Sequence, residues 1–284
     1  MEVLSLYPVV ASVCDALVED NKSLLAFIST CKAVWQYRRS TAWRCVSVTL
    51  QGWNGDGKRR DLCARVHSLT LVHCHDIKDV SALGTVHTLL FYSCSGIRDV
   101  SALGTVHTLS VYDCPGITDV SALRTVHTLT LRYCSGIRDV SALGTVHTLT
   151  LYGCSYITNV SALGTVHTLT LEYCRGITDV SARTVHTLTL RYCYGIRDVS
   201  ALSTVHTLEL YGCDITDVSA LGTVHTLTLG YCSGITDVSS LGTVHDLTIN
   251  SCHNISDVSF LHTVPTLKLI KCPRWGQTLI HYNR

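Results

Sequence analysis

Residues 146–165 read Val-His-Thr-Leu-Thr-Leu-Tyr-Gly-Cys-Ser-Tyr-Ile-Thr-Asn-Val-Ser-Ala-Leu-Gly-Thr, and close copies of this unit fill most of the chain. The cysteine of the unit returns every 20 residues, with two steps of 19, at Cys74, Cys94, Cys114, Cys134, Cys154, Cys174, Cys193, Cys213, Cys232, Cys252 and Cys272. A self-similar period of this length predicts a solenoid in which each coil packs against its neighbours.

The apolar residues of one unit predict the shape of a coil. Leu149 and Leu151 are two residues apart, as in a strand whose alternate side chains both face inward. Ile157, Val160 and Leu163 are three residues apart and predict tight or 3₁₀ turns on the opposite wall. Coils stacked at about 4.8 Å, the spacing between strands, would bury this face continuously. We therefore expect about eleven coils with a parallel sheet along one wall.

The segment Val-x-x-Leu-x-Leu-x-x-Cys resembles the signature of leucine-rich repeats over residues 66–272. The resemblance implies an α/β solenoid, a curved array with its parallel sheet on the concave wall, preceded by a small helical module. We expect residues 46–65 to form an N-terminal cap with a strand over 46–50, and residues 273–284 to form a C-terminal cap. Two units are one residue short, over 181–185 and 213–215, and both losses fall in predicted turns, where loss is tolerated.

Nearly every unit carries one cysteine and one aspartate, and both have a structural explanation. We expect buried, reduced thiols that bond neighbouring carbonyls, and the absence of any Cys-x-x-Cys pair gives no local support for a zinc site. The aspartates, such as Asp99, are expected to cap the next turn by accepting from its N–H groups, whereas the alternative is calcium binding. Asn159 keeps such a cap but loses the charge, which favours capping. We predict no metal site and no cofactor.

The composition excludes several classes of function. Of 284 residues, 46% are hydrophobic and 15% are charged, so disorder is excluded, and a formal net charge of +1 leaves no footprint for nucleic acid or an anionic membrane. Glu2 and Asp15 argue against a secretory signal, and no apolar run reaches membrane-spanning length. We expect a soluble monomer in the cytoplasm, or in the host cytoplasm if the chain is viral. Ser, His and Asp recur through repeat copying on different edges of the coil, so we expect no catalytic triad and no enzyme.

The first 45 residues show no repeat but have apolar residues at helical spacing. They resemble an F-box through Tyr7-Pro8, Leu17, Leu24-Leu25 and Cys31-Lys32-Ala33-Val34-Trp35, although Val9 stands where that family has an acidic residue. The resemblance implies docking of a ubiquitin-ligase adaptor by Pro8, Leu17, Leu24, Leu25 and Trp35. The alternative is a helical cap for the solenoid. Arrays of near-identical repeats of this kind resemble those of protists and large DNA viruses.

Two rows of residues vary most within the copied unit, and we expect them to follow the strand and to line the concave wall. The candidate target-binding residues in these rows are Arg132, Tyr133, Tyr152, Glu172, Tyr173, Arg191, Tyr192 and Tyr211. Tyr and Arg are frequent anchors of protein interfaces. The alternative is that exposed tyrosines merely stack along the edge of the sheet.

These features favour a protein-binding receptor, with the F-box resemblance implying the substrate-recognition subunit of an SCF-type ubiquitin ligase. A scaffold or effector without a link to a ligase is the alternative, and ice binding by the Thr-x-Thr rows is a third reading, which Glu209 and the bulky tyrosines argue against.

A histidine follows the first valine of ten units, at His67, His87, His107, His127, His147, His167, His186, His206, His225 and His245. Stacking of the coils would place these side chains in one row, where protonated imidazoles repel. We expect the row to titrate as a coupled set with lowered proton affinity. The alternative is that the imidazoles fan out into solvent and barely interact.

Overall fold

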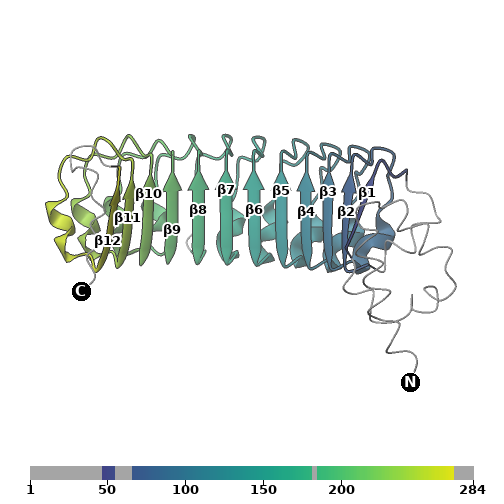
Figure 1. Ribbon diagram of the computed structural model, residues 1–284, viewed down its shortest axis with the longest axis horizontal. Coiled ribbons are helices and arrows are strands. Elements are labelled where there is room, and N and C mark those ends of the chain that lie inside the picture. The colour runs from purple at the N-terminus through teal and green to yellow at the C-terminus, as the bar shows by residue number, and fades with distance from the viewer. Residues whose placement is uncertain (1–46, 55–65, 181–183, 272–284) are drawn as a thin grey trace, which may run out of the picture.

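The computed structural model describes residues 47–54, 66–180 and 184–271. These residues form one parallel sheet of twelve strands in chain order, and Figure 1 shows them side by side. The strands are β1 (Ser47–Gln51), β2 (Ser68–Val72), β3 (Thr88–Tyr92), β4 (Thr108–Tyr112), β5 (Thr128–Arg132), β6 (Thr148–Tyr152), β7 (Thr168–Glu172), β8 (Thr187–Arg191), β9 (Thr207–Tyr211), β10 (Thr226–Gly230), β11 (Asp246–Asn250) and β12 (Thr266–Ile270). The predicted parallel sheet is confirmed, and the strand expected over 46–50 is found as β1.

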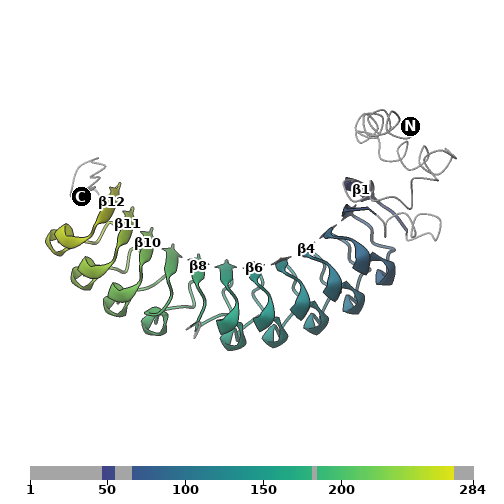
Figure 2. The same cartoon turned by 90° about the horizontal axis from the view of Figure 1, so that it is seen from below.

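Short 3₁₀ helices form the opposite wall, where the spacing of three predicted tight turns. They are η2 (Ser81–Thr85), η3 (Ser101–Thr105), η4 (Ser121–Thr125), η5 (Ser141–Thr145), η6 (Ser161–Thr165), η7 (Ser200–Leu202), η8 (Ser219–Thr223), η9 (Ser239–Thr243) and η10 (Ser259–Thr263). The coils follow an arc with the strands on its inner side and the 3₁₀ helices on its outer side (Figure 2). The predicted curvature and the concave position of the sheet are therefore confirmed.

The core repeats with the coil. In β6 and the turns after it, Leu149, Leu151, Cys154, Ile157 and Val160 are at most 1% exposed. The same positions are buried in the neighbouring coils, so a single apolar column runs along the array. Because no coil can bury this face alone, the stacking of the coils accounts for the stability of the fold.

The two shortened units keep the register of the sheet. Thr168 of β7 pairs with Thr187 of β8, across the first loss, and Thr207 of β9 pairs with Thr226 of β10, across the second. The residues 181–183 at the first loss lie outside the described part of the chain. The second loss removes one residue from the loop after Cys213, where the described loop lacks the turn seen in most other coils. Both losses are therefore absorbed outside the strands.

The ladder cysteines are free thiols buried in the core, as predicted, at all ten positions that the structure describes. The Sγ of Cys134 donates to the carbonyl oxygens of Val111, at 3.6 Å, and Arg132, at 3.4 Å. Burial raises the pKa of Cys134 and Cys174 to about 12. Cys232 is an exception, because a hydrogen bond with Cys252 lowers its pKa to about 7. The thiols act as packing groups with weak donors rather than as disulfide partners.

The aspartate ladder caps the 3₁₀ turns. The backbone N–H of Ser141 donates to Oδ1 of Asp139 at 2.8 Å, and Asn159 accepts the equivalent bond at 2.9 Å. The capping prediction is confirmed, because the carboxylate accepts from the N–H group that opens η5. Val140 occupies the N-cap position, so Asp139 caps from one residue earlier, as in an Asx turn. The hydrogen bond from the Ser141 backbone holds the pKa of Asp139 below its ordinary value.

Several expectations concern residues outside the described ranges. The helical module of residues 1–45, with Pro8, Leu17, Leu24, Leu25 and Trp35, lies there, as does the C-terminal cap of residues 273–284. Within the described ranges, no helix has the length and apolar character needed to cross a membrane.

Candidate functional site on the concave sheet

The concave face consists of the strand residues that alternate with the buried ones. In β6, Thr148, Thr150 and Tyr152 are half-buried, whereas Leu149 and Leu151 are fully buried. Because the strands are in register, each outward position forms a row across the sheet. The first two rows are mostly threonine and the third row varies. The chemistry of this face therefore differs from coil to coil mainly in its third row.

The structure corrects the position of the first variable row. We expected both variable rows to follow the strand, but Arg132, Tyr152, Glu172, Arg191 and Tyr211 are each the last residue of a strand. The strands extend one residue beyond the Leu-x-Leu pattern because the carbonyl oxygens of these last residues still accept sheet hydrogen bonds. This row therefore belongs to the rigid sheet.

The second variable row follows the strand in a left-handed backbone conformation. Tyr133, Tyr173 and Tyr192 have φ angles of 53°, 53° and 52°, and Gly153 and Gly212 occupy the same position in other coils. The N–H of Tyr133 donates to the carbonyl oxygen of Tyr152 at 2.8 Å. Glycine at two positions of this row was the signal in the sequence, since glycine adopts positive φ without strain. This backbone hydrogen bond fixes the position of the Cα atom from which each side chain of the row extends.

Tyrosine and arginine side chains from the two rows touch one another across the sheet, and we call this set the aromatic ribbon. Its members are Tyr92, Tyr112, Arg132, Tyr133, Tyr152, Tyr173, Arg191, Tyr192, Tyr211 and Tyr231. Tyrosine pairs along it have ring centroids 4.8–6.2 Å apart. Arg132 bridges Tyr112 and Tyr152, so the contacts are continuous from β3 to the end of β10. The stacking interpretation and the binding interpretation therefore describe the same residues.

Seven of the eight predicted target-binding residues belong to the ribbon. Glu172 lies in the same row, paired in register with Tyr152 on one side and Arg191 on the other. It forms no ion pair with any other residue that the structure describes. The structure thus brings the predicted residues together, and it adds Tyr92, Tyr112 and Tyr231 to them.

Three of the tyrosine rings pack directly against the backbone of a glycine. A Cβ on Gly153 would lie 2.6 Å from Cδ1 of Tyr133, and a Cβ on Gly212 would lie at the same distance from Cδ1 of Tyr192. Such distances are too short for carbon atoms, so these rings pack on bare backbone. The ring of Tyr211 packs in the same way on the backbone of Gly230. The ring positions in the ribbon therefore depend on a missing side chain in the next coil.

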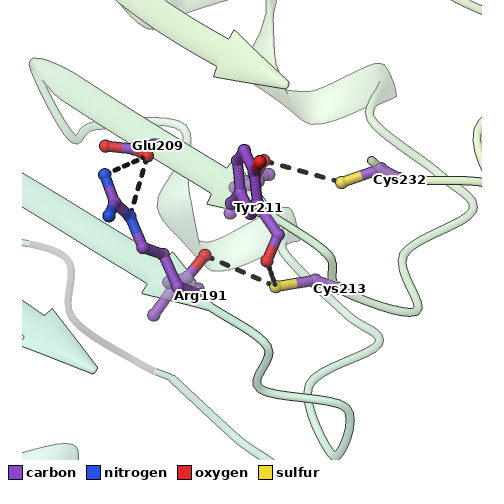
Figure 3. A network of polar contacts seen from close by, with 7 residues as sticks. Arg191, Glu209, Tyr211, Cys213 and Cys232 are labelled. Carbon is purple, nitrogen blue, oxygen red and sulfur yellow. Dashed lines mark hydrogen bonds and ion pairs between the residues drawn. The ribbon is translucent and has the colours of Figure 1, made fainter. Parts of the chain in front are cut away.

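The two arginines of the ribbon differ in charge balance. Arg191 forms an ion pair with Glu209, with Nη2 at 2.8 Å and Nε at 3.0 Å from Oε1 (Figure 3). Arg132 lies between two rings, with Cζ at 3.9 Å from the Tyr152 centroid and 5.3 Å from that of Tyr112. Its Nε is buried without a hydrogen-bond partner, and no described acidic residue forms an ion pair with it. Arg132 therefore presents a positive charge that the described part of the chain leaves unbalanced.

The tyrosines of the ribbon present hydroxyl groups rather than charges. A hydrogen bond with Tyr152 raises the pKa of Tyr133, and burial raises the pKa of Tyr211 to about 12. Burial, and then the neighbouring Tyr192, also raise the pKa of Tyr173. These phenols are neutral near pH 7, so the ribbon combines apolar rings, hydroxyl donors and one free guanidinium.

The histidine row runs along the opposite end of the strands. Consecutive rings from His67 to His245 are stacked with centroids 4.4–4.8 Å apart. Most Nδ1 atoms lie 3.2 Å from the hydroxyl of the next threonine, as His147 does from Thr148. Burial, and then the charges of neighbouring histidines, lower the pKa of His87, His147 and His206. The predicted stacked row is confirmed, and the predicted lowering of proton affinity holds for these three members.

Comparison with known proteins supports the fold. No family model matches the chain, and no curated protein matches it. Among solved structures, the internalin InlF of Listeria monocytogenes is similar with a TM-score of 0.60 and 19% identity, over 89% of this chain and 82% of that one.

Two further proteins of Listeria monocytogenes match less closely. Internalin C2 has 21% identity over 71% of this chain and 80% of its own, with a TM-score of 0.37. The functional domain of InlJ, described as including a cysteine ladder, has 15% identity over 80% of this chain and 68% of its own, with a TM-score of 0.34. Together with the twelve parallel strands in register, the match to InlF shows that the described residues have the leucine-rich-repeat fold.

Proposed function

We propose that the concave sheet binds a protein partner and that the binding centre is the part of the aromatic ribbon around Arg132 and Tyr152. The observation that carries the proposal is the guanidinium of Arg132, which is held between two rings without an ion-pair partner among the described residues. An arginine fixed in this way has already lost part of its rotamer freedom, so less entropy is lost on binding.

The chemistry of the ribbon indicates the character of the partner. Tyr and Arg dominate the energetics of protein interfaces because they bury large areas and still form hydrogen bonds. A buried charge without a counter-charge is destabilising, so the surface that covers Arg132 should supply a carboxylate. Arg191 needs no such group, since Glu209 already balances it. We therefore expect a partner with an acidic side chain that reaches Arg132.

Affinity purification with paired variants of the full chain tests the proposal. The variant Arg132→Ala/Tyr152→Ala removes the cation–π pair at the centre of the ribbon. The control Arg138→Ala/Tyr156→Ala removes the same residue types, also in cation–π contact at 5.0 Å, from the turns outside the concave rows. A protein that is captured by wild type and control but lost with the ribbon variant supports the proposal. Equal capture by all three chains would move the site elsewhere.

The proposal extends to a ligase role on the F-box resemblance of residues 1–45. In this finer form the chain is the substrate-recognition subunit of an SCF-type ubiquitin ligase, with the adaptor at Pro8, Leu17, Leu24, Leu25 and Trp35 and the target on the concave sheet. In the alternative, the chain is a scaffold or effector that binds a partner on the concave sheet but does not bind the ligase adaptor. Binding of the purified ligase adaptor to the full chain therefore separates the two.

Ice binding fits the concave face poorly. A flat lattice needs a flat array of threonines, whereas the sheet follows an arc (Figure 2). Glu209 and Lys268 also interrupt the second threonine row. A thermal-hysteresis measurement is expected to show no activity.

A further inference from the structure

One strand breaks the pattern of the first concave row. At the position before the first inward leucine, every described strand has serine or threonine except β11, which has Asp246. The histidine row ends beside it, since Pro265 replaces the histidine of the next coil. A carboxylate therefore takes the place of a hydroxyl next to the last two histidines of the row.

The replacement brings three ligand atoms together. Nδ1 of His245 lies 3.2 Å from Oδ2 of Asp246, and Nδ1 of His225 lies 4.0 Å from the same oxygen. One ligand atom from each of the three side chains lies within 4.8 Å of the other two, and no other such group of three occurs among the residues that the structure describes.

The backbone holds these residues in place while their side chains reach solvent. The N–H groups of His245 and Asp246 both donate to the carbonyl oxygen of His225, at 3.2 and 3.0 Å. The side chains of His225, His245 and Asp246 are 46%, 55% and 36% exposed. An ion can therefore reach these side chains from solvent, and the sheet hydrogen bonds hold the backbone of the three ligand residues in place.

We propose that His225, His245 and Asp246 form a binding site for a divalent transition-metal ion of the Zn²⁺ type. Zn²⁺ takes imidazole nitrogen and carboxylate oxygen at about 2.0–2.2 Å, which places ligand atoms about 3.4 Å apart in a tetrahedron. The pair of His245 and Asp246 is already close to this separation, at 3.2 Å. To complete the site, the exposed His225 ring leaves its stack on His245 and turns its Nδ1, now 4.0 Å from Oδ2 of Asp246, toward the ion. Water completes the coordination.

The ionisation of Asp246 suits a ligand. A hydrogen bond from the Thr266 hydroxyl, followed by His245 and His225, holds the pKa of the Asp246 carboxyl below its ordinary value. The competing arrangement is an ion pair between the carboxylate and a protonated histidine. The two differ in their pH dependence: metal ligation requires neutral imidazoles and weakens as the pH falls, whereas the ion pair requires a protonated imidazole and strengthens as the pH falls.

Titration of the full chain with Zn²⁺ at pH 7.5, followed by calorimetry, tests the site. The variant Asp246→Thr restores the residue of the other coils, so it is expected to fold normally and to lose at least about tenfold in affinity, since loss of even an outer partner costs about 10–100-fold. Any zinc bound elsewhere by histidine or cysteine is common to both chains and cancels in the difference. Binding is expected to weaken at pH 5.5.

A gain-of-site variant gives an independent readout. The N–H of Thr148 donates to the carbonyl oxygen of His127 at 3.0 Å, as that of Asp246 does to His225, so Thr148→Asp places a carboxylate beside His127 and His147 in the same backbone setting. One additional zinc ion per chain is expected, and visible absorption of bound Co²⁺ should rise in proportion. Equal zinc affinity and stoichiometry in wild type and Asp246→Thr, or no binding up to millimolar zinc, would refute the proposal.

Discussion

Gly153 illustrates how much a single residue decides in a repeated fold. Its φ angle of 64° is the left-handed conformation that its neighbours in the same row adopt with side chains present. What distinguishes it is the ring of Tyr133, which occupies the space that a Cβ would fill. The glycine therefore serves the neighbouring coil rather than its own.

Replacement of Gly153 by alanine is expected to destabilise the fold by about 1 kcal/mol or more, because alanine is strained at positive φ and its Cβ meets the Tyr133 ring. Asp113→Ala is the control, since that position in the row already carries a Cβ. Urea midpoints measure the difference. An unchanged midpoint for Gly153→Ala would show that the ring moves away freely.

The two ribbon arginines should differ in their effect on partner binding. Arg132→Ala is expected to weaken binding by roughly 2 kcal/mol, the loss typical of an interface anchor, because it removes the unbalanced guanidinium. Arg132→Lys should not restore the affinity, since an ammonium cannot lie between two rings as a planar guanidinium does. Arg191→Ala is expected to have a smaller effect. Affinities measured by calorimetry with the captured partner check this order, and a larger loss for Arg191→Ala would contradict it.

For individual residues, the sequence predicted which residues line the concave face better than it predicted the contacts between them. Seven of the eight predicted residues lie in the ribbon because the repeat places each of them at the end of a strand or directly after it, and both positions follow from the local sequence. The balance of Arg191 by Glu209 depends on a contact between two residues 18 positions apart on neighbouring strands, and it was not predicted. The packing of the Tyr133 ring on Gly153 was not predicted, because it depends on which residue of the next coil lies beside the ring.

Among the elements, the 3₁₀ helix η5 begins with a hydrogen bond from the Ser141 N–H to Asp139. Asp139→Ala leaves the Ser141 N–H without its acceptor and is expected to lower the urea midpoint, whereas Asp139→Asn should leave it nearly unchanged, as Asn159 does in its own coil. An equal fall for both variants would indicate that the charge matters rather than the cap.

The histidine row predicts a dependence of stability on pH. The pKa values of His87, His147 and His206 are lowered in the folded chain, so the unfolded chain binds more protons at these sites. Their contribution to stability is present above about pH 6.5, the value for free histidine, and is lost as the pH falls through the lower folded values. The pKa values of capping aspartates such as Asp99 and Asp139 are lowered by their hydrogen bonds, so these carboxylates do not contribute to the change. The urea midpoint is expected to be lower at pH 5.5 than at pH 7.5, and a higher midpoint at pH 5.5 would contradict the interpretation.

On the scale of the whole molecule, the sequence predicted the solenoid, the parallel sheet and its concave position, since a period of 20 residues and the spacings of two and three leave few other folds. The expected number of about eleven coils becomes twelve strands once β1 is included. The F-box resemblance of residues 1–45 rests on a short pattern and stays a prediction.

Exchange of Leu25 and Trp35 for polar residues tests that resemblance. Adaptor binding is expected to be lost while partner binding by the concave sheet is retained, since the two surfaces are in different parts of the chain. Pull-down of the adaptor and of the captured partner from one preparation measures both. Loss of both activities together would favour the alternative, in which residues 1–45 cap the solenoid.

The constant register of the sheet has a consequence for how such a molecule changes over generations. Each described strand meets the next through equivalent positions, even across the two shortened units. Unequal recombination between repeats can therefore insert or delete a whole coil without creating a new kind of contact. Selection can then act on the number of coils and on the third-row residue of each coil. The length of the aromatic ribbon can in this way be matched to the dimensions of its partner.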